Sequence, residues 1–236
     1  MKAMVLAAGL GTRLRPLTDT RPKALVELNG RTLLEITLAR LRHFGVQDVI
    51  VNVHHFAGMV IEYLRTNDNF GMHIEVSRED DLLLDTGGGL KKASWFFRDG
   101  SEPFILHNVD VISTIDLQRM AQFHVDNRAL ATMAVQDRKT SRPLVFDEHL
   151  QLKGRGPGLA FAGIHVVSPP LLPLLTEEGV FSIINSYVRL AAAGERILGF
   201  RADEYYWRDL GKLEDLRYAA ADSDQHEDTK AQRHKE

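Results

Sequence analysis

Cysteine is absent from the 236-residue chain, which excludes disulfides, thiolate metal sites, iron–sulfur clusters and a cysteine nucleophile. An excess of charge of one sign is also lacking, because 29 Lys and Arg stand against 32 Asp and Glu. The run from Ala3 to Ala8 falls far short of the ~20 apolar residues that span a bilayer, and no signal-peptide pattern follows it. We therefore expect a cytoplasmic protein that binds neither nucleic acid nor a membrane.

Short apolar runs alternate with amphipathic segments in the first half of the chain. Strands are predicted at 2–8, 48–54, 72–77 and 103–108, where mostly apolar composition is typical of strands covered on both faces. Helices are predicted at 32–44, 56–66, 88–97 and 116–125. This order predicts an α/β fold with a Rossmann-like, mostly parallel mixed sheet and helices on both of its faces.

The regular alternation of predicted strands and helices ends near residue 128. Strands are predicted at 129–135, 144–146, 159–167 and 196–200, helices at 170–175, 181–193 and 213–219, and turns at 153–158. No Pro- or Ser-rich linker divides the chain, so we expect a single domain over residues 1–220. Residues 221–236 are polar and show no apolar periodicity, which predicts a disordered tail.

The strongest local signal directly follows the first strand. The chain there reads Leu6-Ala7-Ala8-Gly9-Leu10-Gly11-Thr12-Arg13-Leu14-Arg15-Pro16-Leu17-Thr18, and Pro22-Lys23 follows. Gly9 and Gly11 carry no Cβ, so the backbone can turn sharply and offer its N–H groups to phosphate oxygens. Arg13 and Lys23 would add two cations, and the pattern predicts a polyphosphate site at the carboxyl edge of the sheet. A glycine turn beside a solvated basic loop is the plainer alternative.

Spacing excludes two other phosphate-binding loops. A dinucleotide-binding G-x-G-x-x-G motif would need glycine where this chain has Leu14. A Walker A loop would need Ser or Thr after Gly-Lys, but Gly211-Lys212 is followed by Leu213.

The glycine-rich string resembles the signature of the sugar-1-phosphate nucleotidyltransferases, approximately (L)-A-A-G-x-G-T-R-L-x-P-L-T-x-x-x-P-K, at every fixed position. The resemblance implies that Arg13 grips the leaving pyrophosphate and that Lys23 contacts the reacting phosphate, so both are the predicted catalytic residues. It also implies further nucleotide contacts in the loop, at Leu6, Ala8, Gly9, Gly11 and Thr12. The similarity runs over residues 2 to 218 and implies a nucleotide-binding half at 1–128 and a sugar-binding half at 129–220.

A second glycine-rich segment, Leu84-Asp85-Thr86-Gly87-Gly88-Gly89-Leu90, resembles the base-recognition loop of the same family. Its length and triple glycine are most similar to those of the small N-acetylmuramate-1-phosphate uridylyltransferases. The resemblance implies that Thr86, Gly87 and Gly88 bind the nucleotide, with UTP favoured. The same glycines could instead serve only the tight start of a helix.

Two acidic residues are the predicted Mg²⁺ ligands. His107-Asn108-Val109-Asp110 stands where the family usually shows Asn-Gly-Asp, with the Asp on the metal. Trp207-Arg208-Asp209-Leu210-Gly211 resembles the family pattern W-x-D-[VLIT]-G-T up to Lys212, which replaces the usual Thr. Hard carboxylate oxygens suit Mg²⁺, which would offset the charge of a triphosphate. Turn or helix capping is the alternative for each Asp.

The segment Ala160-Phe161-Ala162-Gly163-Ile164-His165 resembles the family's F-x-G-I strand, which lines the sugar pocket. Gly163 and Ile164, together with Asn108, are therefore the predicted sugar contacts. The family's Glu-Lys-Pro element, whose Lys binds the sugar phosphate, is not found. Five basic residues could replace that Lys, although each is also typical of a solvated loop: Arg138, Lys139, Arg142, Lys153 and Arg155.

These patterns together predict a Mg²⁺-dependent nucleotidyltransferase whose partners are a nucleoside triphosphate and a sugar 1-phosphate. A sugar-phosphate oxygen would attack the α-phosphorus in line and release pyrophosphate, with positioning and charge neutralisation carrying the rate. A guanylyltransferase for mannose 1-phosphate is the alternative within the class. An inactive relative that senses nucleotide or NDP-sugar is the alternative from another class. The sugar and the oligomeric state stay open at this point.

Overall fold

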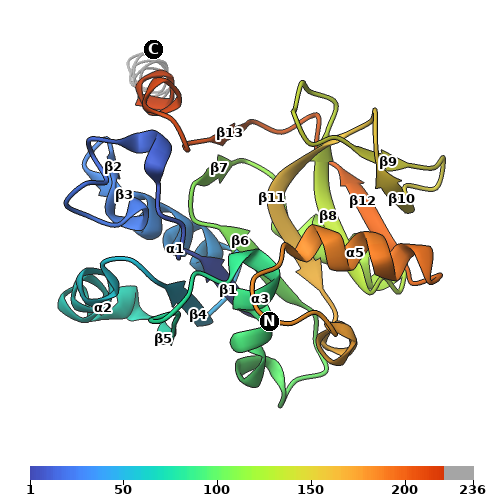
Figure 1. Cartoon of the computed structure of the whole chain (residues 1–236), viewed down its shortest axis with the longest axis horizontal. Coiled ribbons are helices and arrows are strands. Elements are labelled where there is room, and N and C mark those ends of the chain that lie inside the picture. The colour runs from blue at the N-terminus through green and yellow to red at the C-terminus, as the bar shows by residue number, and fades with distance from the viewer. Residues whose placement is uncertain (221–236) are drawn as a thin grey trace, which may run out of the picture.

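A seven-stranded sheet forms the centre of the computed structural model, which describes residues 1–220 (Figure 1). The strands, in spatial order, are β12 (Ile197–Arg201), β8 (Ala131–Gln136), β11 (Ala160–Val167), β6 (Phe104–Asn108), β1 (Lys2–Leu6), β4 (Asp48–Val53) and β5 (His73–Arg78). All neighbours are parallel except β11, which runs antiparallel to β6 and β8. The predicted mostly parallel mixed sheet is confirmed. The predicted tail at 221–236 lies outside the described residues.

Helices cover both faces of this sheet. They are α1 (Leu33–His43), α2 (Ala57–Thr66), α3 (Asp85–Lys92), α4 (Leu117–Asp126) and α5 (Ile183–Ala192), and residues 213–220 are also helical. Side chains alternate across a strand, so β4 sends Val49 and Val51 into the core shared with α1, α2 and α4. Ile50 of the same strand packs in the second core, which holds Leu90 of α3 and Tyr187 of α5. The nearly all-apolar strands are thus explained by burial on both sides.

Three predicted elements differ in the structure. The helix predicted at 88–97 is α3, which begins earlier, at Asp85, and is followed by a separate 3-10 turn at Ser94–Phe97. The helix predicted at 170–175 is a 3-10 helix at Pro169–Leu174, in which the interior Pro173 lacks the N–H group that an α-helix would need there. The turns predicted at 153–158 begin instead with strand β10 (Leu152–Arg155), which pairs with β9 (Leu144–Phe146).

Two small sheets complete the fold. Strands β2 (Glu27–Leu28) and β3 (Arg31–Thr32) form a short hairpin ahead of α1. Strand β7 (Val111–Ser113) pairs antiparallel with β13 (Trp207–Asp209), which places Asp209 opposite Val111. The sequence patterns did not predict this second pairing, which brings residues about a hundred positions apart to one place (Figure 1). No helix among residues 1–220 combines the length and the apolarity needed to cross a membrane.

Candidate active site

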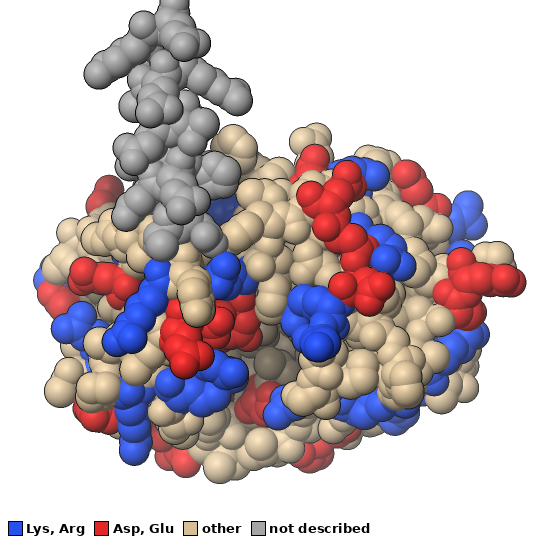
Figure 2. Space-filling model, turned by 90° about the horizontal axis from the view of Figure 1, so that it is seen from above, with Lys and Arg blue, Asp and Glu red and all other residues tan. Residues whose placement is uncertain are grey.

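A cavity of about 380 Å³ opens where β1, β4 and β6 end. It is lined by Leu6, Ala8, Gly9, Lys23, Asn52, Leu83, Asp85, Thr86, Asn108, Val109, Asp110 and Val180. Seven of these are predicted site residues: Leu6, Ala8, Gly9, Lys23, Thr86, Asn108 and Asp110. Figure 2 shows this end of the molecule hollowed near its middle, with acidic and basic side chains on the rim. Because the carboxyl ends of strands in open α/β sheets hold ligands, the position suits a binding site.

The loop after β1 has the geometry that its glycines predict. Gly9 is exposed, and a Cβ there would meet nothing within 4 Å, so its backbone faces open space. Gly11 has a φ of +65°, and a Cβ on it would lie 2.9 Å from Thr18 Cγ2 and 3.0 Å from Lys23 Cβ. Thr18 donates its hydroxyl hydrogen to the carbonyl of Gly11 at 2.9 Å. Glycine at position 11 therefore allows the loop to close against the segment that carries Lys23.

The two predicted metal ligands lie in one place. Asp110 accepts a hydrogen bond from Lys23 Nζ, and these side chains are only 14% and 11% exposed. The backbone N–H of Leu210 donates to the carbonyl of Asp110 at 2.7 Å, which joins the two acidic segments directly. Asp209 follows on the other strand of this pair and accepts from the N–H of Gly211 at 2.7 Å.

The charges of Asp110, Lys23 and Arg13 affect the pKa of Asp209. Burial raises the pKa of Asp209, and the negative charge of Asp110 raises it further, while Lys23 and Arg13 lower it. Arg13 approaches from the glycine-rich loop, because a Cβ on Gly211 would lie 2.5 Å from its Nη2 and 2.6 Å from Asp209 Oδ1. Two acids and two cations thus share a small volume at the end of the sheet. Such a cluster can bind a divalent cation and a polyphosphate together.

The residues present fit a magnesium ion. No group of three or more His, Asp or Glu side chains that could hold a metal occurs among residues 1–220. Mg²⁺ however takes one or two carboxylates from the protein and completes its shell with water and substrate phosphates. Asp110 and Asp209 supply that number of carboxylates, and the hydrogen bond from the Leu210 N–H to the Asp110 carbonyl holds their two segments together.

Gly87 and Gly88 have a packing reason to be glycine. A Cβ on Gly87 would lie 2.4 Å from ring carbons of Phe181, and one on Gly88 would lie 2.4 Å from the carbonyl oxygen of Gly179. Both N–H groups donate to the carbonyl of Phe181, at 2.9 and 3.2 Å. Their predicted contact with nucleotide stays a prediction, and neither glycine lines the cavity. Asp85, at the start of the same helix, lines the cavity with a φ of +59°.

The predicted sugar contacts separate into two groups. Asn108 lines the cavity, and Gly163 packs directly behind it, since a Cβ on Gly163 would lie 3.1 Å from Asn108 Nδ2 and 2.6 Å from Val111 Cγ2. Gly163 has a φ of +77° and sits in an irregularity of β11 between Phe161 and His165. Ile164 is fully buried in the core, so its side chain does not reach the cavity.

Sequence reasoning missed a buried polar link beside the cavity. The amide of Asn52 accepts from the N–H of Ala7 at 2.7 Å and donates to Glu79 at 2.6 Å. Glu79, only 1% exposed, also accepts from the N–H of Leu84 at 2.8 Å. The link ties the glycine-rich loop to the segment before α3. Its sequence signal is Asn52, a polar residue that follows the apolar run 49–51 of β4 and marks a buried partner rather than a solvent face.

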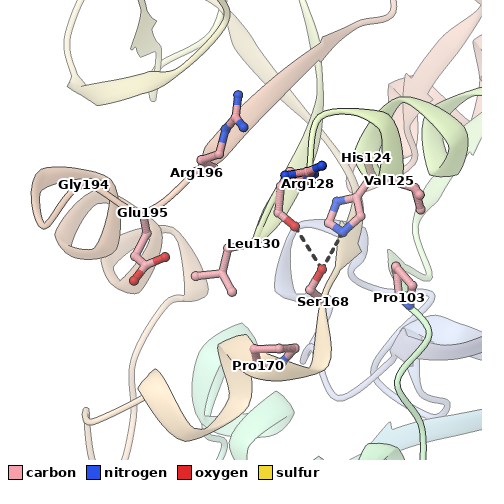
Figure 3. Close-up of a pocket in the computed structure, with 11 residues that line it drawn as sticks. Pro103, His124, Val125, Arg128, Leu130, Ser168, Pro170, Gly194, Glu195 and Arg196 are labelled. Carbon is pink, nitrogen blue, oxygen red and sulfur yellow. Dashed lines mark hydrogen bonds between the residues drawn. The ribbon is translucent and has the colours of Figure 1, made fainter.

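A second cavity, of about 480 Å³, lies at the opposite edge of the sheet (Figure 3). The titratable residue His124 lines it. Its Nδ1 lies 2.9 Å from Thr132 Oγ1, and its Nε2 lies 2.8 Å from Ser168 Oγ. Burial lowers the pKa of His124 to about 4, so the ring is neutral at pH 7. In Figure 3 the guanidinium of Arg196 points away from Leu130 and Pro170. With both ring nitrogens engaged, His124 is placed for structure rather than for proton transfer.

Known proteins resemble this chain in sequence and in fold. The sequence model described as nucleotidyl transferase matches residues 2–144. An N-acetylmuramate alpha-1-phosphate uridylyltransferase of Caulobacter vibrioides is 35% identical, over 89% of this chain and 91% of that protein. A mannose-1-phosphate guanyltransferase of Yarrowia lipolytica is 30% identical, over 92% of this chain and 62% of that protein.

Among solved structures, a UDP-glucose pyrophosphorylase complexed with UDP-glucose superposes with a TM-score of 0.81. The match covers 95% of this chain and 98% of that one. At 17% sequence identity this likeness concerns the fold alone.

Proposed function

The chain belongs to the nucleotidyl transferase family and is an enzyme of the sugar-1-phosphate nucleotidyltransferase type, and from this premise we propose that it joins UTP to a sugar 1-phosphate with the help of Mg²⁺. The products are a UDP-sugar and pyrophosphate. The observation that carries the proposal is the meeting of Lys23, Asp110 and Asp209 beside an exposed glycine-rich loop.

Each group has a task in this reaction that follows from its charge. The backbone amides near Gly9 donate to phosphate oxygens of the nucleotide. Lys23 neutralises charge on the α-phosphate, and Arg13 neutralises the departing pyrophosphate. Asp110 and Asp209 would hold Mg²⁺. When bound, Mg²⁺ supplies a Lewis acid that offsets the negative charge of the triphosphate.

In this reaction no side chain forms a covalent bond with a substrate. A sugar-phosphate oxygen attacks the α-phosphorus in line and the bond to the pyrophosphate breaks on the opposite side. The protein contributes by holding the two anionic substrates together in that geometry. Asn108 lines the cavity with Gly163 packed behind it, and in this proposal it contacts the sugar.

The relatives support UTP but include guanyltransferases, so the base needs a direct test. Pyrophosphate release is measured with UTP, GTP, CTP and ATP, each against the 1-phosphates of N-acetylmuramate, glucose and mannose, with and without Mg²⁺. We expect UTP to give the highest kcat/KM and EDTA to abolish turnover.

Each other result of this panel has a definite meaning. A preference for GTP with mannose 1-phosphate would replace our proposal by the guanylyltransferase alternative. Binding of nucleotide or NDP-sugar without any release of pyrophosphate would instead identify a sensor that has lost its activity.

A further inference from the structure

Five basic residues of the segment 138–155 differ sharply in their surroundings. Arg155 donates to Asn185 Oδ1 at 2.8 Å, and Lys153 pairs with Asp147 at 2.8 Å, so both are engaged at a distance from the cavity. Lys139 and Arg142 are exposed. Arg138 alone among the five is partly buried and packs against the segment that carries Asp209.

The guanidinium of Arg138 is held on two sides. Its carbon lies 3.6 Å from the ring centroid of Trp207, and its Nη2 donates to the carbonyl of Phe161 at 2.7 Å. Trp207 is itself fixed, because its Nε1 donates to the carbonyl of Ala162 at 2.6 Å. Stacking and a fork-shaped donor set are the features by which arginine recognises phosphate. The cation is therefore ordered before any ligand arrives.

This cation stands beside the predicted metal ligands. Trp207 and Asp209 are two positions apart on β13, so their side chains lie on the same face of that strand. Burial lowers the pKa of Arg138, and the negative charge of Asp209 offsets part of this effect. Arg13 lies near Asp209 on the C-terminal side, because a Cβ on Gly211 would contact both side chains. Along the chain, Asp209 thus stands between Trp207, on which Arg138 stacks, and Gly211, which Arg13 approaches.

The bonding of Arg138 is incomplete among the described residues. Its Nε is buried and has no hydrogen-bond partner, although buried polar groups are normally satisfied. Burial lowers the pKa of the guanidinium, and an anion next to it would offset this cost. Arginine keeps its charge at neutral pH, so the side chain offers a fixed positive charge to an anionic ligand.

Resting on the proposed function, we propose that Arg138 binds the phosphate of the sugar 1-phosphate. Phe161 and Ala162, which anchor Arg138 and Trp207 through their carbonyls, belong to the strand that also carries Gly163 beside Asn108. The acceptor phosphate would then lie between Arg138 and the metal-binding acids, opposite the pyrophosphate end that Arg13 serves.

The test compares Arg138→Met and Arg138→Lys with the wild type in steady-state kinetics, using UTP and N-acetylmuramate 1-phosphate, or the pair that the substrate panel selects. We expect Arg138→Met to raise KM for the sugar 1-phosphate about ten- to a hundredfold, as for loss of a charged hydrogen bond. KM for the nucleotide should change less than about threefold. Arg138→Lys should recover part of the loss, because it restores the charge without the stacked fork.

Lys139→Met is the matched control, since it removes one positive charge from the adjacent exposed position and should leave both KM values unchanged. Thermal melting of every variant shows whether the fold is retained. A rise in KM for the nucleotide alone would overturn the proposal and assign Arg138 to the triphosphate. An equal loss of kcat in Arg138→Met and Arg138→Lys, with lowered melting temperatures and unchanged KM values, would overturn the proposal in favour of a structural role.

Titration calorimetry with the same sugar 1-phosphate separates this inference from the proposed function. Weaker binding to Arg138→Met than to the wild type supports the inference even if no pyrophosphate is released, in which case only the reaction was misassigned. Equal binding to both proteins overturns the inference while leaving the reaction intact.

Discussion

Replacing Asp110 by Asn is the most informative single change, because the two side chains have the same shape and differ by one charge. In the wild type, Asp110 and Asp209 balance Lys23 and Arg13. The variant removes one of the two carboxylates of the proposed metal site. Loss of one preorganised charged contact costs about 3–4 kcal/mol of the activation barrier, so turnover should fall about 10²- to 10³-fold.

The same change should leave the fold intact. Asp110 loses a charged hydrogen bond from Lys23, which contributes about 1.5–3 kcal/mol. Part of this is returned, because Asp209 no longer faces a second negative charge and its pKa falls towards its ordinary value. A chain of this size loses about 2–4 °C of Tm for each kcal/mol. The melting temperature should therefore drop by less than about 12 °C.

Three measurements check this reasoning: pyrophosphate release at saturating substrate, the Tm in EDTA, and the rise in Tm on adding MgCl₂ with UTP. Asp147→Asn is the control, since it breaks another Asp–Lys pair, with Lys153, outside the cavity. We expect the control to keep full turnover and Asp110→Asn to lose both turnover and the magnesium-dependent rise in Tm. Near-normal, magnesium-dependent activity in Asp110→Asn would remove Asp110 from the mechanism.

Three further predictions concern other parts of the chain. Arg13→Ala should lower kcat about 10²-fold or more with little change in sugar-phosphate binding, and loss of that binding with normal kcat would reassign the residue. Gly163→Ala should lower the free energy of unfolding by about 1–3 kcal/mol in urea titrations, because of its φ of +77° and the 2.6 Å approach to Val111. His124, whose pKa falls to about 4 on folding, is neutral in the folded state, so its contribution is complete above pH 6.5 and is lost as the pH falls to 4. That loss amounts to about 3 kcal/mol, and urea titrations at pH 7 and 4.5 should show a smaller pH dependence in His124→Gln than in the wild type.

Local chemistry was sufficient to predict the central layers of the fold. The apolar runs at 2–8, 48–54 and 103–108 contain β1, β4 and β6, because strands buried on both faces must be apolar throughout. The glycine-rich loop was predictable for a similar reason, since Gly11 needs a positive φ that few other residues adopt. Propensity misjudged the segment at 170–175, which belongs to the 3-10 helix Pro169–Leu174 with Pro173 in its interior.

Long-range pairing was beyond what the sequence pattern could indicate. Strands β7 and β13 are three residues each, too short for a visible alternation, and only their pairing places Asp209 beside Asp110. The role of Asp209 in the candidate site therefore came from resemblance. Asn52 and Glu79 were missed because a single polar residue in a strand does not reveal its partner. The stacking of Arg138 on Trp207 depends in the same way on the folded arrangement.

The pairing of β7 with β13 also bears on biosynthesis. Asp110 leaves the ribosome nearly a hundred residues before Asp209 does, and the two meet only once the later strand has docked. A nascent chain that has folded its first half thus already displays the glycine-rich loop and Lys23, but only one of the two acids. Because β13 must dock before both acids are in place, we expect activity only after synthesis has passed residue 209.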